Sequence, residues 1–303
     1  MIIPQARSSP MVRFAVLLAL LVALTALASC QRESAREASA PAAGQSGRPN
    51  IVLIQTDDQD AASIAYMPRL QALLVQKGLT FANAFVTYPL CCPSRASLLT
   101  GQYPHNHQNL WNLPPLGGFK KFYDEGREAS TIATWLQTGG YRTALFGKYL
   151  NGYPANAGSL YTPPGWSEWA AMLDNVSTRG YFNYWQVEDS QGVYYGDRPE
   201  EYQTDVLANK VVSFIERAEA DDNQPFFVYF APFAPHSDRA DNGPPIPAPR
   251  HRDAFADLKA PRTPSFYEAD MSDKPRAWQQ LRIPTGETPF LDHLYRSRLR
   301  SLL

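Results

Sequence analysis

One stretch decides how the chain folds: Leu90-Cys91-Cys92-Pro93-Ser94-Arg95-Ala96-Ser97-Leu98-Leu99-Thr100-Gly101. Pro93 suits the first turn of a helix, where its missing N–H costs little. The residues from Ser94 to Thr100 continue that helix, and Gly101 ends it. The sequence therefore predicts that Cys91 and Cys92 lie at a helix N-terminus, where free N–H groups and the helix dipole favour an anion.

The stretch reads Cys-x-Pro-Ser-Arg, then three residues, then Leu-Thr-Gly, and it resembles the signature of the type I sulfatases. In that family a maturase oxidises the first cysteine of the signature to Cα-formylglycine. Cys91 lies two residues before the proline and matches the modified cysteine, whereas Cys92 fills the variable position. The hydrated aldehyde carries two hydroxyls, one to attack sulfur and one to expel sulfate afterwards. An unmodified cysteine has one heteroatom and would stall as a covalent adduct.

A second interpretation makes these two cysteines buried thiols, or half of a zinc site completed by His105 and His107. Adjacent cysteines followed by His-x-His do not match common zinc spacings, so we favour the sulfatase interpretation. In the sulfatase interpretation, one of these two histidines contacts the substrate, or it has a surface or hydrogen-bonding role.

The first 48 residues predict export. Residues 1–30 combine a positive start with an apolar run that is short for a membrane span, which is typical of a signal peptide. Leu27-Ala28-Ser29-Cys30 resembles a bacterial lipobox, so we expect Cys30 to be acylated and to anchor the protein to a bacterial membrane, facing the periplasm or the cell exterior. An uncleaved anchor helix or ordinary secretion is the alternative. Residues 31–48 have the composition of a flexible tether.

The cysteine content and the charge balance exclude two classes of protein. With Cys30 lipidated, only the adjacent cysteines remain, so the chain is not a disulfide scaffold. Its 28 basic and 29 acidic residues balance, and nothing suggests nucleic acid as a partner. The globular part is expected over residues 49–303.

Polar side chains follow three apolar runs that predict strands. Residues 50–54 are typical of a strand buried on both faces, and Asp57 and Asp58 come just after it. Carboxylates at the end of a parallel strand lie where α/β folds bind ligands, and adjacent ones suit Ca²⁺; a solvated acidic turn is the alternative. Lys148 and His236 follow the runs 141–146 and 225–230 in the same way.

The resemblance gives these residues roles. It implies that Asp57 and Asp58 bind one Ca²⁺ together with an oxygen of the modified Cys91. Lys148 matches the lysine that binds the sulfate, and His236 matches a histidine near the leaving oxygen. Arg95 would pair with negative charge on the nucleophile's oxygens. Leu150 replaces the histidine that many arylsulfatases carry two residues after the lysine, and Gly147-Lys148-Tyr149-Leu150-Asn151 reproduces the glucosamine-sulfatase branch.

Other segments carry weaker predictions. We expect a strand over 79–86 and helices over 67–77, 130–137 (capped by Ser130), 205–218 and 290–303. Residues 180–184 and 195–197 are typical of β-hairpins. Five aromatic residues could either stack on sugar rings or fill the core: Trp166, Trp169, Tyr181, Tyr184 and Trp185.

The resemblance implies an α/β, alkaline-phosphatase-like fold with a largely parallel sheet sandwiched by helices. Similar enzymes continue with an Asp-Asn pair for the metal, a further lysine and a small C-terminal domain. We therefore expect the C-terminal part to be missing, and the chain alone to have little activity, to bind calcium weakly, to leave Leu299 and Leu302 poorly covered and to aggregate.

The expected function is a sulfuric ester hydrolase. It would act on sulfated glycans of the glucosamine-sulfate or aryl-sulfate type, with a formylglycine-generating maturase as a partner. A phosphonate or phosphodiester hydrolase of the same superfamily is one alternative. A catalytically impaired glycan-binding fragment is the other.

Overall fold

The computed structural model describes residues 47–303 apart from 156, 159, 175–179, 221–222, 239–242 and 281–284. The predicted signal peptide, Cys30 and all but the last two residues of the predicted tether lie outside the described residues. Within the described part, no helix combines the length and the apolar character that crossing a membrane requires.

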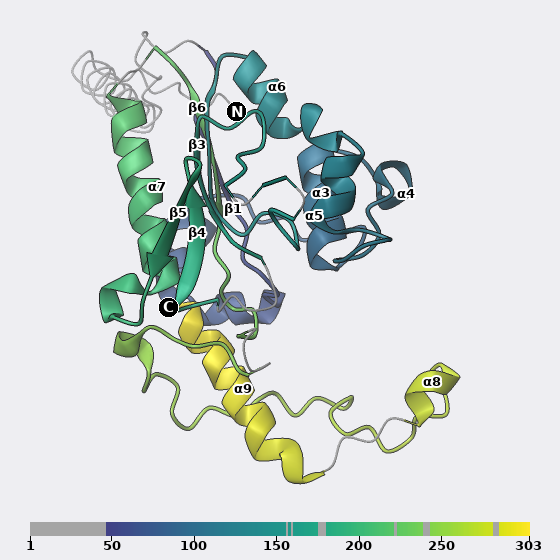
Figure 1. The fold of residues 1–303 in the computed structure, drawn as a ribbon. Helices are drawn as coiled ribbons and strands as arrows, with labels where there is room; N and C mark the ends of the chain where they lie inside the picture. The colour runs from purple at the N-terminus through teal and green to yellow at the C-terminus, as the bar shows by residue number, and fades with distance from the viewer. Residues whose placement is uncertain are drawn as a thin grey trace, which may run out of the picture. The chain divides into compact units, whose positions relative to one another are not determined.

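Six strands form one sheet in the order β1-β6-β2-β3-β4-β5 (Figure 1). The strands are β1 (Ile51–Ile54), β2 (Arg142–Gly147), β3 (Glu168–Met172), β4 (Tyr184–Glu188), β5 (Gln191–Tyr195) and β6 (Phe226–Ala231). The first four in spatial order run parallel, whereas β4 and β5 form an antiparallel hairpin at one side. The prediction of a largely parallel α/β sheet is therefore confirmed.

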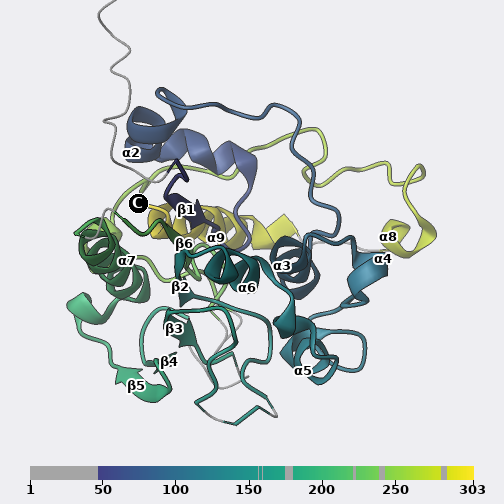
Figure 2. The same ribbon diagram turned by 90° about the horizontal axis from the view of Figure 1, so that it is seen from above.

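Helices cover both faces of this sheet (Figure 2). The longer ones are α3 (Cys91–Thr100), α5 (Gly118–Asp124), α6 (Ile132–Thr138), α7 (Gln203–Glu219) and α9 (Thr288–Ser301). The short ones are η1 (Ala61–Tyr66), α2 (Pro68–Leu70), η2 (Gln71–Val75), α4 (Pro104–His107), η3 (Arg127–Ala129), η4 (Pro199–Glu201), η5 (Pro249–His251), α8 (Arg276–Gln279) and η6 (Thr285–Glu287).

Alternate side chains of the central strands supply the two cores. Leu145 of β2 packs with residues of α3, α5 and α6, such as Leu99 and Phe119. Its neighbour Phe146 points to the other face and packs with α7 residues, including Phe214. These two apolar layers hold the sheet between helices, as the sequence predicts.

The prediction that β1 is buried on both faces is wrong. Val52 and Ile54 are 47% and 51% exposed, whereas Ile51 and Leu53 pack against the core on the α3 side. The reason is position, because β1 is the edge strand of the described sheet and α7 packs on β2 and β6 instead. Only one face of β1 is therefore packed against the core within the described residues.

The predicted strand over 79–86 is also wrong. These residues form no strand, and Phe85 is 88% exposed. Residues of high β-propensity become a strand only where another strand pairs with them, and none pairs with this segment in the described sheet. The segment 67–77 forms the short α2 and the π-helical turn η2 rather than one regular helix. Thr131, not Ser130, caps α6 in a capping box with Thr134.

Aromatic side chains of the middle region mainly build the core. Trp166, Trp169, Tyr181 and Tyr184 are buried, so the core alternative holds for them, whereas Trp185 is 48% exposed. The hairpin of β4 and β5 turns at Asp189 and Ser190, which both have positive φ.

The final helix is better packed than the sequence suggests. Leu299 of α9 is buried, which corrects the expectation that it is poorly covered, and Leu302 is half-buried. Arg298 donates a hydrogen bond to the backbone oxygen of Asp58, and Tyr295 packs edge-on against Tyr66. These contacts tie α9 to the loop that follows β1.

Candidate active site

Helix α3 begins at Cys91 and ends before Gly101, which takes the left-handed conformation with φ 66°. The N–H of Gly101 donates to the carbonyl of Ser97 at 2.8 Å, which closes the helix. Cys91 is half-buried and is the first helical residue. The predicted helix is therefore confirmed, and its N-terminus presents Cys91 to the carboxyl edge of the sheet.

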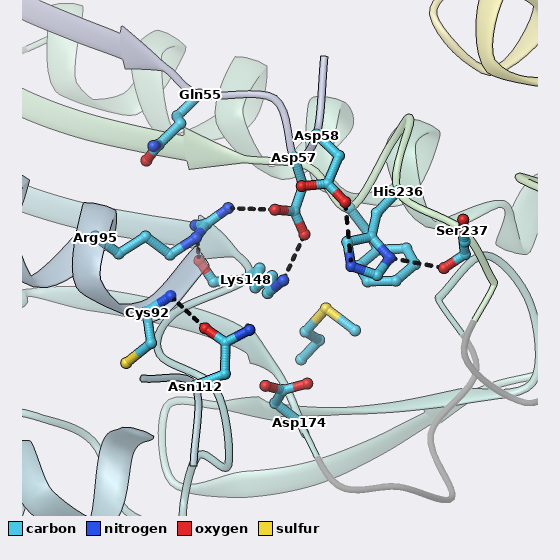
Figure 3. A network of polar contacts seen from close by, with 12 residues as sticks. Gln55, Asp57, Asp58, Cys92, Arg95, Asn112, Lys148, Asp174, His236 and Ser237 are labelled. Carbon is cyan, nitrogen blue, oxygen red and sulfur yellow. Dashed lines mark hydrogen bonds and ion pairs between the residues drawn. The ribbon is translucent and has the colours of Figure 1, made fainter. Parts of the chain in front are cut away.

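The two adjacent cysteines have different surroundings. The side chain of Cys92 is fully buried in the core beside α5, and its backbone N–H donates to Asn112 Oδ1 at 2.9 Å (Figure 3). Burial raises the pKa of the Cys92 thiol to about 12, so this thiol stays protonated. Burial also raises the pKa of Cys91, but Cys91 lies next to Asp57 and His236. Only Cys91 is placed for chemistry.

The histidines after α3 do not extend this site. His107 is fully buried in α4, and its Nε2 lies 2.9 Å from Ser97 Oγ. The N–H of Asn109 donates to His107 Nδ1 at 3.1 Å, so both ring nitrogens are engaged in structural hydrogen bonds. His105 stacks on Tyr103. The zinc alternative has no support from these contacts.

A buried charge cluster of Asp57, Lys148 and Arg95 lies at the carboxyl ends of β1 and β2 (Figure 3), and Cys91 Sγ lies within 4.8 Å of its Asp57 carboxylate. Asp57 Oδ2 accepts from Lys148 Nζ at 2.5 Å, and Asp57 Oδ1 lies 3.6 Å from Arg95 Nη2. All three side chains are almost completely buried. One anion faces two cations, so the cluster carries a surplus positive charge that suits a bound anion.

The electrostatics of Asp57 follow from these partners. Burial by itself would raise the pKa of Asp57, but the charges of Lys148, Arg95 and His236 outweigh it. The pKa of Asp57 is therefore held well below its ordinary value, and the carboxylate stays ionised.

Backbone contacts fix Lys148 and Arg95. Gly147 ends β2 with φ 124°, and an added Cβ there would come within 2.0 Å of the Ala231 carbonyl oxygen, so only glycine fits. The next N–H, that of Lys148, donates to the same carbonyl at 2.8 Å. Arg95 Nη1 donates to the Lys148 carbonyl at 2.7 Å and to Tyr229 OH at 3.3 Å.

His236 approaches from the loop after β6. Its Nδ1 lies 2.7 Å from the carbonyl oxygen of Ser237, which can only accept, so Nδ1 carries the hydrogen. This leaves Nε2 facing Asp58 Oδ2 at 3.5 Å. The ring also packs on Phe233 with centroids 4.7 Å apart. His236 is thus oriented with Nε2 toward the acidic residues after β1.

One group of side chains in the described part could hold a metal ion. A carboxylate oxygen of Asp57, Cys91 Sγ and a ring nitrogen of His236 all lie within 4.8 Å of one another. Asp58 is half exposed and has φ 64°; its Oδ2 lies 3.5 Å from His236 Nε2, and its charge acts on Cys91. Two carboxylates suit Ca²⁺, and an oxygen in place of the Cys91 sulfur would extend that preference. As it stands, the group offers one carboxylate oxygen, one sulfur and one ring nitrogen, a set that suits Ca²⁺ only with an oxygen in place of the sulfur and with Asp58 added.

The match to a family model decides the classification. Residues 49–302 match the model described as Sulfatase. The chain belongs to the sulfatase family. The match covers almost all of the described part, including every residue of the charge cluster.

Relatives within the sulfatase family are similar over most of this chain. It is 38% identical over 288 residues to an arylsulfatase of Volvox carteri, covering 88% of this chain and 43% of that protein. It is 37% identical over 266 residues to human N-acetylglucosamine-6-sulfatase, covering 84% and 46%. The chain therefore spans less than half the length of these relatives.

A solved structure shares the fold. One protein, solved with its substrate D-glucosamine-2-N,6-O-disulfate, superposes with a TM-score of 0.56 at 22% identity, covering 83% of this chain and 53% of that chain. At this identity the likeness supports the fold alone. The relatives also include a Drosophila melanogaster protein named an extracellular sulfatase homolog, 37% identical over 84% of this chain and 22% of that protein.

Sequence reasoning missed several residues that shape this candidate site. Asn112 receives the Cys92 N–H, and Tyr229 accepts from Arg95 and donates to Gln55. Asp174 accepts from the N–H of Gly152 at 2.9 Å. Asn112 and Asp174 come from loops without a motif, and Tyr229 lies inside an apolar run that predicts only burial, so no local signal could have identified them.

Proposed function

We propose that this chain carries the formylglycine-dependent site of a sulfuric ester hydrolase that acts on sulfated glycans. The observation that supports this most is Cys91, first residue of a helix, placed beside a buried cluster with surplus positive charge. A helix N-terminus and two buried cations together favour an anion the size of a sulfate group.

The described residues divide the work. Lys148 Nζ carries three N–H groups. One donates a hydrogen bond to Asp57 Oδ2, so the others can donate hydrogen bonds to the sulfate oxygens. Arg95 is held by the Lys148 carbonyl and by Asp57, and it keeps the positive charge fixed beside Cys91. Once converted to formylglycine, position 91 supplies a hydrate as the nucleophile.

His236 is proposed to serve the leaving oxygen. Its Nδ1–H is committed to the Ser237 carbonyl, so a proton for the leaving alcohol would come from Nε2. Nε2 faces the carboxylate of Asp58 at 3.5 Å, on the side of the acidic residues that follow β1.

We further propose that Asp57, Asp58 and an oxygen of the modified Cys91 hold one Ca²⁺. Bound there, the ion would supply positive charge to the sulfate and the nucleophile.

The substrate and the location are proposed from the motifs and the relatives. The human relative is named for N-acetylglucosamine 6-sulfate, and residues 147–151 carry the glucosamine-branch motif. Sulfated glucosamine residues or aryl sulfates are thus the proposed substrates. Export by the predicted signal, with Cys30 as a lipid anchor, would place the protein where such glycans occur.

The test is turnover by the protein completed with the C-terminal part that the resemblance implies, co-expressed with a formylglycine-generating maturase and supplied with calcium. Sulfate release is measured from an aryl sulfate, beside the matching aryl phosphate ester. We expect sulfate release that Cys91→Ala abolishes and that the control Cys92→Ala retains. A completed protein with converted Cys91 that releases no sulfate, or that prefers the phosphate ester, would contradict the proposal.

A further inference from the structure

The proposed mechanism does not use Glu128, a buried carboxyl hydrogen-bonded to the residue after Lys148. Glu128 of η3 is 4% exposed. Its Oε1 accepts from Tyr149 OH at 3.1 Å and its Oε2 accepts from Tyr161 OH at 2.8 Å. Within the described residues, no lysine or arginine pairs with it. Such a group is costly to bury, which suggests a role beyond packing.

The surroundings of Glu128 are aromatic. Tyr149 packs against Trp169 with ring centroids 5.2 Å apart, and Tyr161 packs edge-on against Tyr123 of α5 at the same distance. Tyr153 belongs to the same aromatic group, and its ring centroid lies 5.5 Å from that of Trp169. The ionisable groups that face Glu128 or its two partners are Tyr149, Tyr161, Tyr153, Tyr123 and Cys92.

The nearest charges on the same turn point elsewhere. Arg127 pairs with the exposed Glu125 at 2.6 Å. Glu128 therefore meets hydroxyl groups rather than a counter-ion, and both of its oxygens are engaged.

This arrangement connects directly to the active site. Tyr149 is the residue after Lys148, whose backbone carries contacts to Arg95 and Ala231. Two residues further on, the carbonyl of Asn151 accepts from the N–H of Phe119 at 2.7 Å. Fixing the Tyr149 side chain thus restrains the backbone segment that presents Lys148 to the site.

We propose that Glu128 is a positioning residue: its carboxyl joins Tyr149 to Tyr161 and thereby holds the segment 148–151, with Lys148, in place. Only the consequence for sulfate binding rests on the proposed function. The joining itself rests on the two hydrogen bonds and the burial of Glu128.

The protonation of Glu128 makes this arrangement sensitive to pH. Burial raises the pKa of Glu128 to about 7, although the hydrogen bonds from Tyr161 and Tyr149 lower it. The ionised carboxylate accepts from both tyrosines, whereas the protonated acid uses one oxygen as a donor. Because the folded-state pKa is raised, the contribution of Glu128 to stability is full below about pH 4.5 and is lost as the pH rises through 7.

Two readouts test the proposal without any turnover: the pH dependence of unfolding, and amide hydrogen exchange at residues 148–151. Relative to Glu128→Gln, the folding equilibrium constant of the wild type should fall by about tenfold per pH unit between pH 5 and 7, the slope for one proton. The control Glu125→Gln changes an exposed acid three residues before Glu128 and should keep the wild-type slope of stability against pH.

At pH 5, where the contribution of Glu128 to stability is largely present, Glu128→Ala removes the acceptor of both tyrosine hydroxyls. It should exchange the amides of 148–151 about tenfold faster, the scale of one lost hydrogen bond. Amides of α7 should be unaffected. Tyr161→Phe keeps the carboxyl and should also loosen 148–151, so it replaces Glu128→Ala if that variant does not fold. Equal pH slopes in wild type and Glu128→Gln, or faster exchange spread evenly over the chain, would overturn the proposal. Because neither readout involves sulfate, failure of the proposed function is told apart from failure of this inference.

Discussion

Removing charges from the buried cluster one at a time should give unequal losses of stability. Asp57 is the single anion between Lys148 and Arg95. Asp57→Asn leaves two buried cations without a partner, and breaking a buried pair in this way costs about 3–5 kcal/mol. Lys148→Met leaves the pair of Asp57 and Arg95 intact, so we expect a smaller cost of about 1–3 kcal/mol. The double variant should cost less than the sum, with a coupling of about 1–3 kcal/mol.

The assay is urea unfolding at pH 7 in the presence of a chelator, so that no cation replaces the lost charge. A matched control is the exposed pair of Lys120 and Asp124 on α5, where Lys120→Met should cost under about 0.5 kcal/mol. The acid side gives a second check. Because the pKa of Asp57 is lowered, its contribution is present above its ordinary value of 3.8 and is lost as the pH falls below it. Asp57→Asn should lack that acid-induced loss.

The test of this reasoning is which of the two single variants, Asp57→Asn or Lys148→Met, loses more stability. If Lys148→Met costs as much as Asp57→Asn, the cluster has no surplus positive charge. If the double variant shows no coupling, the hydrogen bond from Lys148 to Asp57 does not contribute to folding. Either result would refute the account of why an anion binds there.

Three further outcomes are expected. In the active protein, Lys148→Ala or His236→Ala should lower the turnover of an aryl sulfate by about two to four orders of magnitude, and near-wild-type rates would remove them from the site. In the unmodified chain, iodoacetamide followed by peptide mapping should label Cys91 well before Cys92, whose thiol is fully buried; equal labelling would contradict the assignment of the two cysteines. Cys30→Ala should release the protein from the membrane or leave its signal uncut, as fractionation would reveal.

The sequence predicted the parts of the fold that depend on local chemistry. The helix after Cys91 was predictable because Pro93 and Gly101 mark its first turn and its end. The parallel strands β1, β2 and β6 were predictable from their apolar runs, whereas the parallel strand β3 was not predicted. A charged or polar residue follows the runs of β1 and β2 within a few positions, and that is why the ends of these two strands could be assigned to one site.

Features that depend on distant partners were not predictable. Val52 looks like any core residue of a strand, and only the sheet order places it on an edge. Residues 79–86 have strand-forming side chains but lack a pairing partner in the described sheet. Glu128 resembles an ordinary exposed acid in sequence, since the two tyrosines that bury it lie 21 and 33 residues later.

The central claim is that Cys91, and not Cys92, becomes the catalytic formylglycine. Peptide mass spectrometry of the chain co-expressed with a maturase tests this most directly. We expect the peptide mass to decrease by the amount that corresponds to conversion of the Cys91 thiol to an aldehyde. Cys92 should be recovered as a thiol that can be alkylated after denaturation. An unmodified Cys91 in cells whose maturase converts a control sulfatase peptide, or conversion at Cys92, would contradict the claim.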